Sequence, residues 1–195
     1  MRILGVDPGL TRCGIGVIEA LPGRKVRLVA VDVIRTAADM APEKRLMRMA
    51  EAFEEWLADH RPDAVAVERV FAQHNVRTVT GTAQVAGLAM VAATRVAIPV
   101  ALHTPSEVKA AVTGSGRAEK AQVQEMVRRI LGLDDAPSPA DAADALAIAI
   151  THGWRGSAVV PLDGARTQTA AQRAWAEAAA GTAARAQAAR RRLAR

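Results

Sequence analysis

The chain is poor in cysteine and in aromatic residues. Cys13 is the only cysteine among 195 residues, which excludes an intramolecular disulfide and a zinc site built on several thiolates. Tyrosine is missing, and aromatic residues make up 3% of the chain. A module that stacks several bases on an aromatic sheet surface is therefore not expected.

The chain also lacks the hydrophobic segments that target a protein to a membrane or anchor it there. Its N-terminus enters a short apolar segment without the pattern of a signal peptide. The longest uncharged stretch, residues 78–94, contains four Thr, one Gln and two Gly, which makes it too polar for lipid. We therefore expect a soluble protein of a reducing compartment, located in the cytoplasm and without a membrane partner.

Positive charge is concentrated at one end of the chain, whose formal net charge is +6. Residues 1–154 contain 18 Lys or Arg and 18 Asp or Glu, whereas residues 155–195 contain eight Arg and two acids. This division predicts a globular domain over residues 1–154 and a flexible or marginally helical Ala- and Arg-rich tail over residues 155–195. Such a tail binds nucleic acid non-specifically or stays solvated, so the net charge says nothing about the domain.

Hydrophobic patterning predicts an α/β fold with a mixed sheet. Five strands are expected, at residues 2–7, 12–20, 25–35, 64–68 and 98–103. Five helices are expected, at residues 42–60, at residues 78–97, from Pro105, at residues 118–131 and from Ser138-Pro139 onward. Three antiparallel strands followed by strands that alternate with helices indicate a mixed sheet.

Two of the predicted strands end on an acidic residue. Asp7 ends the first strand and Glu68 ends the fourth, and the interiors of both strands are apolar. If these strands are neighbours, the two carboxylates lie side by side at one sheet edge, about 4.8 Å apart, which suits a shared cation. Taken singly, each acid also fits a strand-end cap or a salt-bridge partner.

The last predicted helix begins with a second acidic pair. Asp141 and Asp144 stand at positions i and i+3, so they share one helix face in a segment otherwise made of Ala and Leu. Stabilisation of the helix N-terminus is the structural explanation of this pair. Four carboxylates without a Cys or His quartet instead suit two Mg²⁺ or Mn²⁺ ions, which activate water and stabilise the leaving oxygen in phosphodiester cleavage.

Two lysines and one loop are candidates for contact with phosphates and bases. Lys109 and Lys120 flank the flexible segment Gly114-Ser115-Gly116, although both also fit ordinary solvated lysines. Phe71 lies in a polar loop, where its ring either stacks on an unpaired base or covers the core. The neighbouring residues that offer polar or cationic contacts are Arg69, Gln73, His74, Asn75 and Arg77.

Several short motifs follow one another in order along residues 1–154. The opening motif is Ile3-Leu4-Gly5-Val6-Asp7-Pro8-Gly9, followed by Thr11 and Gly14. The later motifs are Glu68-Arg69-Val70-Phe71, Val108-Lys109, Ala118-Glu119-Lys120-Ala121-Gln122-Val123-Gln124 and Asp141-Ala142-Ala143-Asp144-Ala145-Leu146-Ala147. This ordered set resembles the RuvC family of bacterial Holliday-junction resolvases, whereas Asp-Pro-Gly alone is a weak signal.

The resemblance implies an RNase H-like fold, with a five-stranded mixed sheet flanked by helices, in a homodimer. It implies a Mg²⁺-dependent crossover junction endodeoxyribonuclease that nicks two opposed strands of a four-way junction symmetrically during homologous recombination and DNA repair. The expected products carry 5′-phosphate and 3′-hydroxyl ends. Two Mg²⁺ ions per active site, with Mn²⁺ as a substitute, and a RuvA–RuvB branch-migration partner are implied as well.

The resemblance also implies roles for individual residues. The four residues that match the family's metal-binding catalytic acids are Asp7, Glu68, Asp141 and Asp144. Lys120, and secondarily Lys109, match its basic residues near the scissile phosphate, so Lys120 is counted as catalytic. The expected DNA contacts are Arg69, Phe71, Gln73, Asn75, Arg77, Lys109 and Lys120.

Three other interpretations stay open at this point. A Yqgf-like RNase H-fold protein acting on RNA also opens with an Asp-x-Gly turn, although the Asp141–Asp144 helix and the Phe71 loop favour the resolvase. The sequence Asp-Pro-Gly-x-Thr is also typical of actin-like sugar kinases, which need a second such domain that 195 residues do not accommodate. In the third interpretation the chain is a non-catalytic binding module and the acids are structural.

Overall fold

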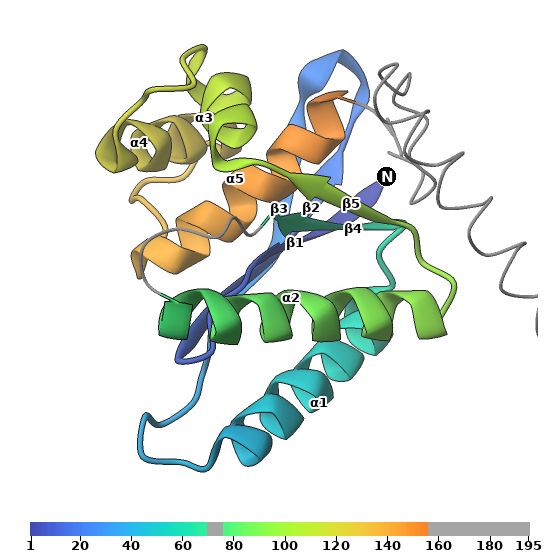
Figure 1. Cartoon of the computed structure of the whole chain (residues 1–195). Coiled ribbons are helices and arrows are strands. Elements are labelled where there is room, and N and C mark those ends of the chain that lie inside the picture. Colours follow the sequence, from blue (N-terminus) through green and yellow to red (C-terminus); the bar gives the residue numbers. More distant parts are fainter. Residues whose placement is uncertain (70–75, 156–195) are drawn as a thin grey trace, which may run out of the picture. The chain divides into compact units, whose positions relative to one another are not determined.

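The five predicted strands form one mixed sheet in the computed structural model, which describes residues 1–69 and 76–155 (Figure 1). The strands are β1 Arg2–Asp7, β2 Arg12–Ala20, β3 Val26–Arg35, β4 Ala64–Glu68 and β5 Val100–His103. Their order in the sheet is β3-β2-β1-β4-β5. β1, β2 and β3 pair antiparallel, whereas β1, β4 and β5 pair parallel, which confirms the mixed sheet expected from the sequence.

Within residues 1–69 and 76–155, five α-helices and one short 3-10 helix accompany the sheet. They are η1 Pro22–Arg24, α1 Pro42–His60, α2 Val76–Arg95, α3 Pro105–Thr113, α4 Lys120–Leu131 and α5 Ala140–Arg155. In the described part of the chain, no helix combines the length and the apolar character needed to cross a membrane.

Several predicted boundaries were wrong by about two residues, for local physical reasons. α2 ends at Arg95 rather than at residue 97, because Ala97 adopts a left-handed backbone with φ of 57°. β5 correspondingly begins at Val100 rather than at residue 98. α4 begins at Lys120 rather than at residue 118, because Glu119 and Gln122 form a reciprocal capping box at that point.

The two faces of the sheet are covered by different helices. α1 and α2 pack on one face, and α3, α4 and α5 pack on the other (Figure 1). Alternation along β1 follows this division, since Leu4 and Val6 belong to the core beneath α1 and α2, whereas Ile3 belongs to the core beneath α5. Asp7 lies four residues after Ile3 along β1 and therefore on the same face, so its side chain is on the face that α5 covers.

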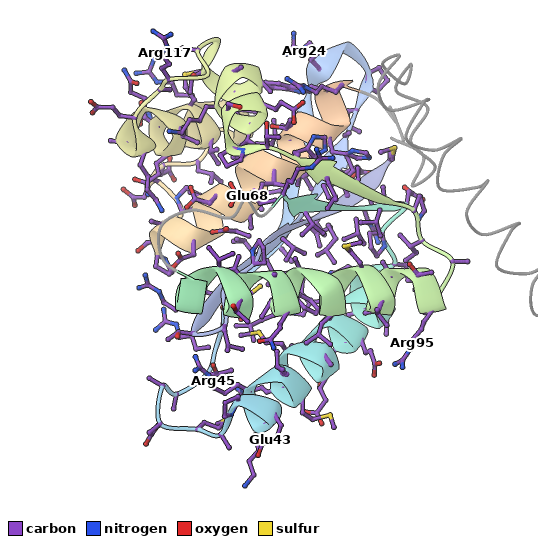
Figure 2. The ribbon with its side chains drawn as sticks, in the orientation of Figure 1. Arg24, Glu43, Arg45, Glu68, Arg95 and Arg117 are labelled. Atoms are coloured by element: carbon purple, nitrogen blue, oxygen red, sulfur yellow. The ribbon has the colours of Figure 1, made fainter. Side chains whose placement is uncertain are left out.

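α5 lies unusually close to the sheet at its N-terminal end. A Cβ atom on Gly14 of β2 would lie only 2.0 Å from the carbonyl oxygen of Asp141, so this close approach requires glycine. At the other end of α5, the Trp154 indole Nε1 donates a hydrogen bond to the Arg24 carbonyl oxygen at 2.8 Å. The Arg24 guanidinium, labelled in Figure 2, also stacks 4.5 Å from the Trp154 ring centroid. The N-terminal end of α5 is thereby fixed to the sheet, and its C-terminal end is fixed to η1, between β2 and β3.

Candidate active site

The two strand-end acids lie on neighbouring strands, which is the condition under which the sequence places their carboxylates side by side. β1 and β4 are parallel, and their register pairs Val6 with Val67, so Asp7 and Glu68 follow at the same edge of the sheet. Figure 2 shows Glu68 on the side of the sheet that α5 covers. The carboxyl ends of β1 and β4 therefore bring both acids under the first turns of α5.

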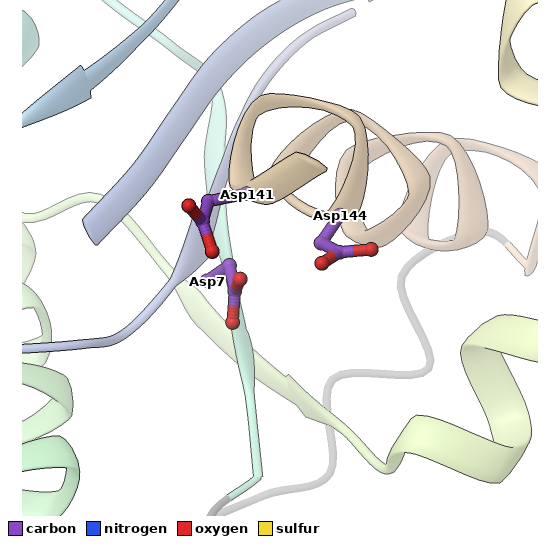
Figure 3. A group of neighbouring side chains, drawn as sticks. All are labelled: Asp7, Asp141 and Asp144. Atoms are coloured by element: carbon purple, nitrogen blue, oxygen red, sulfur yellow. The ribbon is translucent and has the colours of Figure 1, made fainter. Parts of the chain in front are cut away.

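Three carboxylates converge where α5 crosses the end of β1. One oxygen from each of Asp7, Asp141 and Asp144 lies within 4.8 Å of the others (Figure 3). Glu68 is outside this close group, although it was predicted as an equal member. It faces the same cavity of about 320 Å³, whose polar lining residues are Asp7, Glu68, Lys109, Lys120 and Asp144.

Burial and mutual repulsion make this acidic group costly when no metal is present. Burial, followed by the negative charges of Glu68, Asp144 and Asp141, raises the pKa of Asp7 to about 8. Burial and the charge of Asp144 also raise the pKa of Glu68. Neighbouring carboxylates whose repulsion raises the pKa values of Asp7 and Glu68 fit a divalent metal ion, which would offset that repulsion. The acidic cluster is therefore consistent with divalent metal binding.

Lys120 compensates part of the negative charge. Its Nζ lies 2.6 Å from Asp144 Oδ2, while its side chain is 58% exposed. Although burial alone would lower the pKa of Lys120, its hydrogen bond to Asp144 and the negative charge there raise it. Lys109 of α3 lines the same cavity, so both lysines predicted from the sequence reach the acidic group.

One cation of the site, Arg12, was not predicted from the sequence. This first residue of β2 places its Nε 3.2 Å from Asp141 Oδ2. That oxygen is buried and makes no hydrogen bond of good geometry within the described residues, so the contact with Arg12 is ionic only. A single arginine after a turn carries no spacing signal, and only the packing of α5 on β2 shows its role.

A buried histidine pair behind the acidic group was also missed. His103 Nε2 lies 3.3 Å from His152 Nδ1, and the β4–β5 register pairs His103 with Glu68. Burial, together with the neighbouring His152, lowers the pKa of His103 to about 4. Burial lowers the pKa of His152 as well. Two neutral histidines therefore tie the end of β5 to α5.

Several predicted DNA contacts lie outside the described residues or side chains. Phe71, Gln73 and Asn75 belong to the segment 70–75, and residues 156–195 of the predicted tail are also outside the described part. Arg77 lies in α2, but its side chain is not among those described. Arg69 is described: its backbone N–H donates to the His103 carbonyl oxygen at 2.7 Å, directly after Glu68. The roles of all these residues stay predictions.

The fold and the site together define a class of protein. A five-stranded mixed sheet that carries carboxylates on the ends of β1 and β4 and on a helix crossing them, in a cluster consistent with divalent metal binding, is typical of nucleases with an RNase H-like fold. The family model described as "Crossover junction endodeoxyribonuclease RuvC" matches residues 3–152. The chain belongs to the RuvC family and is a hydrolytic endodeoxyribonuclease.

Individual relatives agree with this assignment. The chain is 64% identical over 155 residues to a RuvC of Saccharopolyspora erythraea, covering 80% of this chain and 78% of the relative. It is 58% identical over 181 residues to a RuvC of Paenarthrobacter aurescens, covering 92% of this chain and 96% of the relative. Both relatives are named crossover junction endodeoxyribonuclease RuvC.

Solved structures extend the comparison. The structure of Thermus thermophilus RuvC in complex with Holliday junction substrate matches with a TM-score of 0.76 and 39% identity, covering 80% of this chain and 94% of that chain. The yeast mitochondrial Holliday junction resolvase Ydc2 matches with a TM-score of 0.57 at 15% identity, covering 78% of each chain. The second similarity concerns the fold alone, which confirms the RNase H-like architecture.

Proposed function

We propose that this chain resolves four-way DNA junctions in homologous recombination and DNA repair, by nicking two opposed strands symmetrically. The observation that carries the proposal is the convergence of Asp7, Asp141 and Asp144 within 4.8 Å beside the Lys120 ammonium, at a site consistent with divalent metal binding. The junction-bound T. thermophilus relative supports a four-way junction as the substrate. The expected products carry 5′-phosphate and 3′-hydroxyl ends.

Asp7, Glu68, Asp141 and Asp144 would hold two Mg²⁺ ions, with Mn²⁺ as a substitute. Carboxylate oxygens are the hard ligands that both ions prefer, and the polar lining of the cavity offers no competing thiolate. When bound, the ions supply a water of lowered pKa and offset the charge that develops on the leaving oxygen. Asp7 is the central ligand in this proposal, because its pKa is raised by all three other acids.

Lys120 would stabilise the negative charge that builds up on the scissile phosphate. Its ammonium group has three donors, so it can keep its contact with Asp144 while it donates to a phosphate oxygen. The exposure of more than half of its side chain leaves the group accessible from solvent. Lys109, on the opposite side of the Gly114–Gly116 segment, would act as a secondary phosphate contact in the same cavity.

The remaining partners follow from family membership and from the symmetry of the substrate. A homodimer would present two identical active sites related by a twofold axis, which matches the two equivalent strands of a junction. Besides the four acids, the residues proposed to contact DNA are Arg69, Phe71, Gln73, Asn75, Arg77, Lys109 and Lys120. A RuvA–RuvB complex as partner and a cytoplasmic location are proposed on the same basis.

The domain organisation proposed for this activity separates chemistry from non-specific attraction. Residues 1–154 would form the nuclease domain, and residues 155–195 would add attraction to DNA through their eight arginines. Every residue to which we assign a role at the acidic site lies in the first of these segments.

Cleavage of a synthetic four-way junction with Mg²⁺, compared with linear duplex and with an RNA–DNA hybrid, tests the proposal. We expect paired nicks in the junction only, and we expect Asp7→Asn to abolish cutting while it still binds the junction. Asp59→Asn, on the exposed face of α1, is the matched control for loss of one carboxylate. Preferred cutting of RNA, or retained cleavage by Asp7→Asn, would overturn the assignment.

A further inference from the structure

Arg12 is held against the acidic group by the backbone of the fold. It is the first residue of β2, and Gly14, two residues later, contacts the carbonyl oxygen of Asp141 through the close approach of α5. The Arg12 Nε lies 3.2 Å from the Asp141 carboxylate oxygen Oδ2. The close approach of β2 and α5 therefore places the backbones of Arg12 and Asp141 near each other, so the fold itself brings the guanidinium beside the carboxylate.

The surroundings of Arg12 would repel it if Asp141 were absent. The β2–β3 register places Arg12 directly opposite Arg35, and like charges at paired strand positions destabilise a sheet. Arg35 forms no ion pair with any described residue. The pair with Asp141 is therefore the interaction that accounts for a cation at position 12.

The ion pair is incomplete, and its two partners differ in exposure. Asp141 Oδ2 is buried and has no hydrogen bond of good geometry among the described residues, although Arg12 Nε is only 3.2 Å away. The Arg12 side chain is 59% exposed, whereas the Asp141 side chain is 17% exposed. Arg12 can therefore leave into solvent without disturbing the core, while the carboxylate stays in place.

We infer that Arg12 is a built-in competitor of the divalent ion at Asp141. It acts as a positioning residue: its guanidinium neutralises the carboxylate while no metal is bound, and it is displaced toward solvent when a divalent ion takes that oxygen. This inference rests on the proposed role of Asp141 as a metal ligand. Because a guanidinium stays charged at all physiological pH values, the competition persists across that range and lowers the affinity of the site for its metal.

Lys120 holds a different place in the same group. Lys120 approaches Asp144 from α4, whereas Arg12 approaches Asp141 from β2, so each aspartate of α5 has its own cation. A phosphate that enters the cavity reaches Lys120, which lines it, but Arg12 is not among the lining residues. The competing role is therefore assigned to Arg12, and the phosphate role to Lys120.

Mn²⁺ binding by the full-length protein without DNA, measured by isothermal titration calorimetry, tests this inference. Replacement of Arg12 by Gln removes the competing charge, so we expect Arg12→Gln to bind Mn²⁺ roughly two- to fivefold more tightly than the wild type. Arg35→Gln removes an equal charge from the facing strand position without touching Asp141, and its Mn²⁺ affinity should equal that of the wild type. Arg12→Lys keeps the charge and should bind Mn²⁺ with an affinity close to that of the wild type.

Thermal unfolding gives a second measurement. Without metal, Arg12→Gln leaves Asp141 uncompensated, so its melting temperature should be lower than that of Arg35→Gln. Added Mn²⁺ should then raise the melting temperature of Arg12→Gln more than it raises that of the wild type, because tighter binding stabilises the folded state more. In an Asp141→Asn background, Arg12→Gln should leave the Mn²⁺ affinity unchanged.

The outcomes separate this inference from the proposed function. Clear binding of Mn²⁺ by the wild type, with only weak binding by Asp141→Asn, supports the metal site. If Arg12→Gln then binds Mn²⁺ no more tightly than the wild type, the role of Arg12 alone is overturned. Absence of Mn²⁺ binding by the wild type overturns the metal site itself. If Arg12→Gln does not fold, Arg12→Lys decides. A Mn²⁺ affinity of Arg12→Lys far from that of the wild type, or a different rise in its melting temperature on addition of Mn²⁺, contradicts a role based on charge.

Discussion

Gly14 of β2 lies directly beneath the backbone of Asp141: a Cβ atom at position 14 would be only 2.0 Å from the Asp141 carbonyl oxygen. The position of Asp141 and Asp144 thus depends on the lack of a side chain at Gly14 of β2. Because the same helix turn carries Asp141 and Asp144, any change at Gly14 moves two proposed metal ligands together, away from Asp7.

Gly14→Ala is therefore expected to displace the start of α5 and to separate the carboxylates. We expect a loss of cleavage of at least about 100-fold, since misplacement of reacting groups by about 1 Å costs that much, and a loss of stability of about 1–3 kcal/mol. Junction cleavage and urea unfolding measure the two effects. Gly87→Ala in α2, where a Cβ would meet no atom within 4 Å, is the control and should leave cleavage intact.

The raised pKa of Asp7 predicts a stability that falls as pH rises. In the metal-free fold this pKa is about 8 instead of 3.8, so between these values the folded protein binds a proton that the unfolded chain releases. The contribution of the Asp7 carboxyl to the free energy of unfolding is thus complete at acidic pH and is lost as the pH rises toward 8. We expect Asp7→Asn, which carries no charge, to be more stable than the wild type at pH 8, by on the order of 1–4 kcal/mol.

Urea unfolding of the two proteins in EDTA, at several values from pH 4 to pH 8, measures this difference. The advantage of Asp7→Asn should shrink toward pH 4, while the exposed control Asp59→Asn should show no such trend. A variant that is less stable than the wild type at pH 8 contradicts the electrostatic explanation.

The buried pair His103 and His152 predicts an opposite trend. The pKa of His103 is lowered to about 4, so between pH 4 and 6.5 the unfolded chain binds a proton that the folded protein excludes. The contribution of His103 to the free energy of unfolding is thus present above pH 6.5 and is lost as the pH falls from 6.5 to 4. His103→Gln should therefore be less sensitive to acid than the wild type between pH 6.5 and 4, by roughly 1–3 kcal/mol over that range.

Melting temperatures of wild type and His103→Gln, measured at each pH without metal, test this expectation. His60→Gln, at the end of α1, controls for the loss of a histidine elsewhere. Equal acid sensitivity of wild type and His103→Gln would show that the buried pair is not the acid-labile element.

Lys120 is expected to act on the rate of the reaction. Lys120→Ala should lower kcat by roughly 100- to 1,000-fold, because it removes a donor that stabilises charge on the phosphate in the transition state. Junction affinity should change little, and Mn²⁺ affinity should not fall, because the ammonium neutralises Asp144 when no metal is bound. Single-turnover cleavage and filter binding separate these effects, with Lys44→Ala on α1 as control. An unchanged kcat would contradict the role of Lys120.

Sequence reasoning predicted those parts of the site that depend on local pattern. Asp7 and Glu68 were each predicted to end an apolar strand, and the parallel pairing of β1 with β4 places both at one edge of the sheet. Asp141 and Asp144 were predicted to act together because their spacing places them on one helix face. Local periodicity determines the strand ends and the shared helix face, whereas the pairing of β1 with β4 depends on the assembled sheet.

Features that depend on tertiary packing were not predictable. Arg12 and Asp141 are 129 positions apart, and no spacing rule connects a residue after a turn with a residue in the last helix. Sequence also did not show that Glu68 lies outside the close group of three acids, because that depends on how α5 crosses the sheet. The early end of α2 depends on a left-handed Ala97, a conformation that the residue type does not favour.

The C-terminal tail carries the chain's excess of positive charge. Residues 1–154 are neutral by count, so removal of residues 156–195 removes most of the chain's excess of arginine. Non-specific attraction to DNA depends on such charges through the release of counterions, so the truncated protein should bind junctions with a weaker dependence on salt. Mg²⁺-dependent cleavage should persist, because the acidic group and Lys120 are retained. A full-length variant whose tail arginines are replaced by Gln should behave like the truncated protein, whereas loss of cleavage in both would assign the tail a role in the reaction.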